Sequence, residues 1–125
     1  MTRKSRPVFL NLAQIQMPVG ALTSIGHRIT GVLLAVGVPL SLYLLYLSLH
    51  SAQTFAALTT LLGHTAVKGA MLIFVWALAH HVLAGVRHLL TDFNVGSTLH
   101  AARRSAWFVN LCGVAIVLVA AGLLL

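Results

Sequence analysis

The chain has 125 residues, of which 59% are hydrophobic and 7% are charged, whereas an ordinary soluble domain has about 25% charged residues. Its mean hydropathy is +0.98. A water-soluble fold of this size would expose most of that apolar surface. The composition therefore excludes a soluble enzyme, a disordered tail and a nucleic-acid-binding domain, and it indicates a chain whose solvent is lipid.

The N-terminal stretch is basic and half apolar, and it contains Pro7 and Pro18. Neither the apolar core of a secretory signal nor a small-residue cleavage site follows the basic residues directly. The stretch is also too short to hold a typical mitochondrial presequence. We therefore expect a bacterial membrane protein with an intact N-terminus, whose first segment, through Gly20, lies in the membrane interface.

Three apolar runs follow, and each is long enough to span a bilayer. The first, Ile29–Leu49, carries no charge and would extend roughly 31 Å as a helix. Pro39 within it predicts a mild kink. The second run is Ala66–Leu90, and the third is the uncharged Ala106–Leu125. Three runs cannot close a β-barrel, so the sequence predicts an all-α membrane protein with three transmembrane helices preceded by a short interfacial segment.

The polar segments His50–Thr65 and Thr91–Ser105 are predicted to be the loops between these spans. We expect residues 1–125 to form a single membrane-anchor domain, because no internal repeat or low-complexity segment is evident. The lone Cys112 lies inside the third run, so no disulfide can form within the chain. We interpret it as a small packed or lipid-facing thiol.

The positive charges predict the orientation of the chain in the membrane. With three spans, the N-terminus and the second loop share one side. That side holds all but one of the 8 Lys and Arg residues, the exception being Lys68. Because cytoplasmic loops carry an excess of Lys and Arg, we expect the N-terminus in the cytoplasm. The residues on that side are Arg3, Lys4, Arg6, Arg28, Arg87, Arg103 and Arg104.

The second run carries histidines that need an explanation, because polar residues inside a bilayer are costly. His81 and His88 are seven residues apart and fall nearly on one helical face, with Ala84 and Gly85 between them. Small residues let a flat group approach the backbone, and a neutral imidazole can ligate haem iron. Arg87 and His88, nearer the surface, could then hold the haem propionates. The pattern favours a haem site with His81 as an axial ligand.

Other interpretations of these residues stay open. His81 could merely hydrogen-bond a neighbouring helix. His80 points about 100° away from it, and we interpret it as an interhelical packing residue. Arg87 and His88 could be snorkelling side chains that mark the membrane surface. The histidines in or beside loops are interpreted as solvated; they are His50, His64 and His100.

A low-spin haem b needs two axial ligands on opposite faces of its ring. His81 and His88 project from one side of one helix, so they cannot clamp a ring between them. His27, at the mouth of the first span, is expected to lie nearer the surface than His81. The second ligand is therefore expected to come from another subunit.

The start of the first span offers a second polar group. Ser24, His27 and Arg28 stand at positions i, i+3 and i+4, which share a helical face. A quinone head needs hydrogen-bond donors to its carbonyl oxygens within an apolar pocket. Ser24 could donate to such an oxygen, and Arg28 could stabilise the charge that develops on reduction. The alternative is a helix cap with a snorkelling arginine. Both polar groups lie on the same membrane side, because the first two spans run antiparallel.

These segments resemble the cytochrome b subunit of succinate dehydrogenase, the larger of its two membrane anchors. RPVFLNL (Arg6–Leu12) resembles the opening of that family, and SIGHRITGV (Ser24–Val32) resembles its S-x-x-H-R-x-[ST]-G signature. HHVLAGVRHLLTDF (His80–Phe93) resembles its H-x-x-x-G-x-R-H-x-x-x-D signature. The resemblance covers nearly the whole chain. Two positions depart from the pattern, because Gly26 replaces a larger apolar residue and His80 stands where an aromatic residue is often seen.

The resemblance implies a membrane anchor of complex II, an enzyme of the tricarboxylic acid cycle and of electron transport, in the bacterial cytoplasmic (inner) membrane. Electrons would pass from succinate, whose active site is on another chain, through flavin and iron–sulfur clusters to ubiquinone. The implied partners are a flavoprotein subunit, an iron–sulfur subunit and a smaller anchor. His81 matches the axial ligand of haem b, whose other ligand would come from the smaller anchor. Ser24 and Arg28 match quinone-site residues, and His27, together with Arg28 and His88, is assigned to the haem propionates.

Two other functions stay open at this point. A cofactor-free structural anchor, or a small transporter subunit, would explain the apolar runs and the cation bias equally well. It would not explain why the polar residues of both motifs crowd one membrane side. The anchor of a fumarate reductase is a further alternative, distinguished by its use of menaquinone.

Overall fold

The computed structural model describes residues 16–125, which fold into four helices. These are α1 (Val19–His50), α2 (Ala52–Gly63), α3 (Thr65–Asp92) and α4 (Leu99–Leu124). Within the described residues there is no strand, and α1, α3 and α4 are long and apolar enough to cross a membrane. The prediction of an all-α membrane protein with three transmembrane helices is confirmed. The expected interfacial segment falls mostly on residues 1–15, outside the described part, and Gly20 already belongs to α1.

The long helices extend beyond the apolar runs from which they were predicted. α1 begins at Val19 instead of Ile29, and α4 begins at Leu99 instead of Ala106. Hydropathy marks the part of a helix that hydrocarbon surrounds, whereas the helix itself continues through the membrane interface. The predicted loop Thr91–Ser105 is therefore too long. The chain reverses within residues 93–98, where Asn94 (φ 60°) and Gly96 (φ 71°) adopt the left-handed conformation that these residue types tolerate best.

The prediction of a loop over His50–Thr65 is wrong, because most of this segment forms α2. The Ser51 hydroxyl accepts a hydrogen bond from the Thr54 N–H at 3.1 Å, and the Thr54 hydroxyl accepts one from the Ser51 N–H at 3.1 Å. This reciprocal pair satisfies amides that the first turn of a helix leaves unpaired. Leu58 of α2 is buried against the bundle. The segment was predicted to be a loop because it is polar, but its N-terminal cap and its leucine spacing specify a helix.

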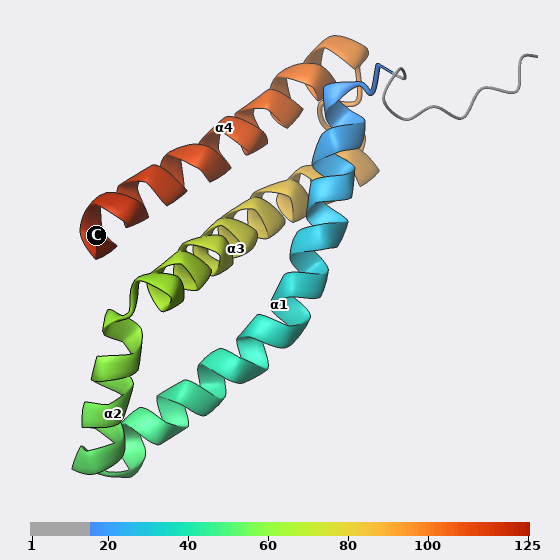
Figure 1. Ribbon diagram of the computed structural model, residues 1–125. Helices are drawn as coiled ribbons and strands as arrows, with labels where there is room; N and C mark the ends of the chain where they lie inside the picture. Colours follow the sequence, from blue (N-terminus) through green and yellow to red (C-terminus); the bar gives the residue numbers. More distant parts are fainter. Residues whose placement is uncertain (1–15) are drawn as a thin grey trace, which may run out of the picture.

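The three long helices gather at one end of the molecule, where α1 begins, α3 ends and α4 begins (Figure 1). α2 lies at the opposite end, between the end of α1 and the start of α3. Pro39 lies inside α1 and cannot donate a backbone hydrogen bond. Figure 1 shows α1 changing direction along its length, as the proline predicts. Among the described residues, Arg87, Arg103 and Arg104 lie near the gathered end, whereas Lys68 lies beside α2.

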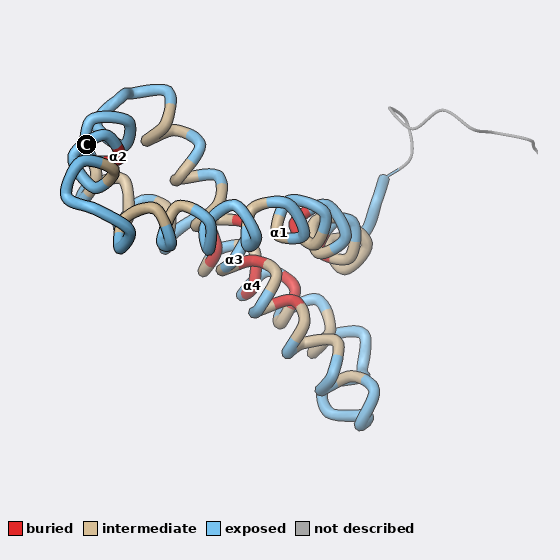
Figure 2. Tube along the Cα trace, turned by 90° about the horizontal axis from the view of Figure 1, so that it is seen from below, coloured by how far each residue is buried: buried red, intermediate tan, exposed pale blue. Residues whose placement is uncertain are grey.

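The buried positions concentrate where α1, α3 and α4 meet (Figure 2). Ala77, Ala84 and Ala106 have no exposed surface, and Gly113 is buried beside them. Small residues at such a seam let two helix backbones approach closely, which is how helices pack when lipid surrounds them. The large apolar side chains are mostly exposed on the outer faces. These faces have the character of a surface that contacts lipid or other membrane subunits.

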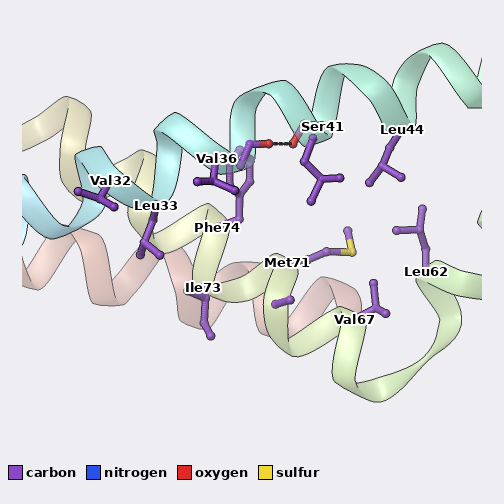
Figure 3. A pocket seen from close by; sticks show the side chains of 13 residues that line it. Val32, Leu33, Val36, Ser41, Leu44, Leu62, Val67, Met71, Ile73 and Phe74 are labelled. Carbon is purple, nitrogen blue, oxygen red and sulfur yellow. Dashed lines mark hydrogen bonds between the residues drawn. The ribbon is translucent and has the colours of Figure 1, made fainter.

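An apolar cavity of about 430 Å³ lies between α1, α2 and the first half of α3. Figure 3 shows its lining, in which Val36, Met71 and Phe74 are prominent. Its hydroxyl group, on Ser41, donates to the Gly37 carbonyl at 2.8 Å. The cavity is lined by no titratable side chain. The polar chemistry of the chain therefore lies elsewhere, towards the end where the three long helices gather.

Candidate functional site: a histidine cluster between α1 and α3

His27 of α1 lies between two histidines of α3. Its ring is stacked on that of His81, with centroids 4.1 Å apart and planes at 14°. Its centroid is 5.1 Å from that of His88, with the planes tilted by 56°. The prediction that His81 and His88 share a helical face is therefore confirmed. We call His27, His81 and His88 the histidine cluster.

Two expectations about this region are wrong. His27 is stacked beside His81 and does not lie nearer the surface, because α1 begins at Val19 and His27 is about two turns inside it. The slot expected over Ala84 and Gly85 is also filled. A Cβ at Gly85 would lie 3.4 Å from Nε2 of His27, and Ala84 is fully buried. The small residue Gly85 thus admits the His27 ring.

The hydrogen bonds of His81 fix which of its ring nitrogens carries the proton. Its Nδ1 lies 3.1 Å from the backbone carbonyl oxygen of His27 and 3.3 Å from Oγ1 of Thr30. A carbonyl oxygen only accepts, so Nδ1 donates and Nε2 keeps its lone pair. Metal-binding histidines use this arrangement, in which a backbone acceptor holds one nitrogen and orients the other towards the metal. His81 therefore fits the role of a haem ligand.

Two residues of α1 support this geometry, and the sequence argument did not assign either of them a role. The Thr30 hydroxyl is fully buried and lies 2.9 Å from the Gly26 carbonyl and 3.0 Å from that of His27. A Cβ at Gly31 would lie 3.1 Å from Cε1 of His81, so the glycine lets the imidazole lie against the helix. Thr23 and Thr30 are seven residues apart on the inner face of α1, and that spacing was the available signal.

Ser24 and Arg28 lie one turn apart on α1, beside the histidine cluster. Ser24 is half-buried and Arg28 is exposed. Residues at i and i+4 of a helix are neighbours, so a hydroxyl and a guanidinium stand together at the surface of the bundle. This pair can present hydrogen-bond donors to the oxygen of a ligand bound outside α1.

Arg87 connects α3 to α4 by hydrogen bonds within the chain. Its Nε donates to the Ser105 hydroxyl at 3.0 Å, and an Nη donates to the Ala102 carbonyl at 3.2 Å. The side chain thus ties the end of α3 to the start of α4. The two sequence interpretations, a propionate contact and a snorkelling side chain, did not include this connection between helices. His88, the next residue, faces the histidine cluster instead.

His80 is buried on the other side of α3, with 3% of its surface exposed. Its Nε2 lies 3.2 Å from Oδ1 of Asn110 on α4, and the Thr23 hydroxyl of α1 lies 3.3 Å from the same oxygen. The interpretation of His80 as an interhelical packing residue is confirmed. Asn110 was missed, although an amide within an apolar run is a signal in its own right.

Within residues 16–125, no three His, Cys, Asp or Glu side chains are grouped so that they could hold a bare metal ion. Haem iron is held in its porphyrin and takes only axial ligands from protein. One correctly oriented imidazole is therefore a sufficient contribution from this chain.

Comparison with known proteins identifies the family to which the chain belongs. Residues 2–121 match the family described as succinate dehydrogenase/fumarate reductase transmembrane subunit. The chain belongs to this family. It is thus a membrane-spanning subunit of an oxidoreductase complex, and the resemblance seen in its motifs is confirmed.

Individual relatives agree with this assignment. The succinate dehydrogenase cytochrome b556 subunit of Coxiella burnetii is 40% identical over 115 residues, which cover 90% of this chain and 92% of the relative. The subunit of the same name from Paracoccus denitrificans is 34% identical over 110 residues, covering 85% and 82%. The mitochondrial cytochrome b560 subunit of Mus musculus is 32% identical over 122 residues, covering 95% of this chain and 68% of the mouse protein.

Proposed function

We propose that this transmembrane subunit is the larger, haem-binding anchor of succinate dehydrogenase. It holds haem b together with a smaller anchor subunit and forms part of the site at which ubiquinone is reduced. The succinate active site lies on another chain. The observation that supports this most strongly is the hydrogen bond from Nδ1 of His81 to the His27 carbonyl at 3.1 Å, because it leaves Nε2 available to iron.

His81 is the axial ligand contributed by this chain. Haem b, when bound, supplies one-electron transfer between the iron–sulfur subunit and quinone. The stacked rings of His27 and His81, with centroids 4.1 Å apart, leave no room for a porphyrin between them. His27 is therefore not the second ligand, which comes from the smaller anchor. His27, His88 and Arg28 line the same side and hold the haem propionates through charge-assisted hydrogen bonds.

Ser24 and Arg28 form this chain's part of the quinone site. The Ser24 hydroxyl donates to a quinone carbonyl oxygen and orients the head group. The Arg28 guanidinium stabilises the negative charge that develops on that oxygen as electrons arrive. Both side chains lie on α1 next to His27 of the histidine cluster, so the residues that would hold the quinone and those that would hold the haem are neighbours.

The chain acts as a single membrane-anchor unit over residues 1–125, in the bacterial cytoplasmic membrane, with its N-terminus in the cytoplasm. The flavoprotein and iron–sulfur subunits dock at the end where the arginines lie. The relatives named above are succinate dehydrogenase subunits, which favours that enzyme over a fumarate reductase. The histidine cluster argues against a cofactor-free anchor or a transporter subunit.

The first test removes the ligand. In the complex co-expressed with its partner subunits and purified, we expect His81→Ala to abolish or strongly weaken the reduced b-type absorption band, because no other imidazole of this chain is oriented to replace it. His64→Ala, at an exposed position between α2 and α3, is the control and should keep the band. A band that survives His81→Ala unchanged would rule out the axial role.

The second test separates the quinone site from the succinate site. We expect Arg28→Ala to lower ubiquinone reduction by about tenfold or more, since a hydrogen bond to a charged group contributes about 1.5–3 kcal/mol. Succinate oxidation with an artificial acceptor should be retained. Arg104→Ala, another exposed arginine, serves as the control. An equal loss of both activities in Arg28→Ala would contradict the assignment.

A further inference from the structure

We propose that His80 is a positioning residue, and that its bond to Asn110 and its packing against Gly26 set the rotation of α3 and thereby the direction of His81. This inference rests on the proposed role of His81 as a haem ligand. It concerns residues that do not themselves touch the haem. We call His80, Asn110 and Gly26 the rotation clamp.

The first step is geometric. Consecutive residues of a helix point about 100° apart, so the direction of His80 fixes the direction of His81. His80 is 3% exposed and held between helices, whereas His81 is half-buried at the edge of the bundle. Contacts that fix the direction of the buried His80 side chain therefore also orient His81.

The second step identifies what fixes it. Oδ1 of Asn110 lies 3.2 Å from Nε2 of His80 and 3.3 Å from the Thr23 hydroxyl. One amide oxygen of α4 thus connects α3 and α1 in the interior of the bundle. Thr23 also bonds the Val19 carbonyl of its own helix at 3.0 Å, whereas lipid offers Nε2 of His80 no alternative partner, so rotation of α3 would leave that nitrogen unpaired.

The third step concerns Gly26. A Cβ at this position would lie 2.8 Å from Cε1 of His80, which is closer than real Cβ atoms approach, and 3.1 Å from its Nε2, which is a tight contact. The imidazole can occupy its place only because residue 26 is a glycine. The two positions at which the chain departs from the motif pattern are therefore in contact, and the smaller residue accommodates the polar one.

The fourth step distinguishes the adjacent histidines. An amide oxygen only accepts, so His80 carries its proton on Nε2, whereas His81 carries its proton on Nδ1. Nδ1 of His80 is buried and has no hydrogen-bond partner among the described residues. Of these two histidines, only His81 has an unprotonated Nε2 and a side chain that is not fully buried. The clamp thus selects which of two neighbouring imidazoles can meet iron.

The experiment uses the purified complex and measures the haem spectrum, the electron paramagnetic resonance signal, the haem midpoint potential and thermal unfolding. His80→Phe keeps a ring and removes the bond, and Asn110→Leu removes the acceptor. We expect both to shift the low-spin haem signal and the midpoint potential while succinate oxidation by an artificial acceptor is retained. His80→Gln, whose amide can donate to Asn110, should return both readouts towards the wild type. His64→Phe is the matched control.

A second pair of variants covers the case in which His80→Phe fails to assemble. We expect Gly26→Ala to lower the melting temperature and the haem content. His80→Ala in the same chain should raise the melting temperature again, because it removes the clashing ring, but it should leave the haem signal altered, because the bond to Asn110 is lost. Gly69→Ala on α3 is the control, since nothing lies within 4 Å of its added Cβ.

Unchanged haem readouts in both His80→Phe and Asn110→Leu would overturn the inference. Failure of His80→Ala to raise the melting temperature of Gly26→Ala would do so as well. A wild-type complex without any b-type absorption would instead contradict the proposed haem function. The thermal comparison of Gly26→Ala with the double variant would then decide alone whether the clamp exists.

Discussion

At this site, the hydrogen-bond acceptor next to each imidazole determines which ring nitrogen carries the proton and which keeps its lone pair. His81 and His80 are adjacent in sequence, yet the first donates from Nδ1 to a carbonyl and the second from Nε2 to an amide oxygen. The difference depends on the partners that α1 and α4 supply.

Thr30 is the residue through which this effect can be measured. Thr30→Val keeps the shape and removes the hydroxyl that lies 3.3 Å from Nδ1 of His81. We expect about 1 kcal/mol less stability and a lower ratio of haem to protein after purification, with the carbonyl of His27 still holding the ring.

Thr59→Val on α2 is the matched control, because the Thr59 hydroxyl makes a similar bond to a carbonyl of its own helix at 2.9 Å. Thermal unfolding and the pyridine haemochrome assay report the two quantities. Equal haem loss in both variants would contradict a specific role for Thr30.

At the scale of elements, α3 and α4 are joined at their connected ends by Arg87 as well as by packing. The guanidinium makes two hydrogen bonds, to Ser105 and to the Ala102 carbonyl. We expect Arg87→Lys to lower the stability of the complex by about 1–2 kcal/mol, because an ammonium group cannot reproduce this two-pronged contact.

The lysine variant keeps the positive charge, so orientation in the membrane should be unaffected. Hydrogen exchange of residues 93–98 would report loosening of the α3–α4 junction. Arg103→Lys, at an exposed position on α4, is the comparison. Wild-type exchange rates in Arg87→Lys would show that the arginine acts by its charge alone.

The sequence was sufficient to predict the long helices and the face shared by His81 and His88, because apolar run length and helical periodicity are local properties. α2 was missed because its formation depends on the Ser51–Thr54 cap and on packing of Leu58, which hydropathy does not report. The place of His27 was predicted wrongly because it depends on where α1 crosses α3. The partnership of His80 with Asn110 joins residues 30 apart, and no local pattern reveals such a pair.

At the scale of the whole molecule, charge asymmetry and helix number together predict the side on which the C-terminus lies. α4 runs from the arginine-bearing end to the opposite end (Figure 1). If the basic end faces the cytoplasm, Leu125 lies on the periplasmic side. Alkaline phosphatase fused after Leu125 should be active, and green fluorescent protein fused there should be dark. The same fluorescent protein fused before Met1 should fluoresce. The reverse pattern would invert the proposed orientation.

The seam between α3 and α4 has a consequence for how the chain can vary. It is built from alanine and glycine at positions such as Ala77, Ala84, Ala106 and Gly113, whereas bulky residues occupy the outward faces. Larger side chains at the fully buried Ala77, Ala84 and Ala106 would push the helices apart, while outward positions can exchange one bulky apolar residue for another at little cost. Tolerance to amino-acid exchange in this protein should therefore depend more on which face of a helix a residue occupies than on its depth in the bilayer.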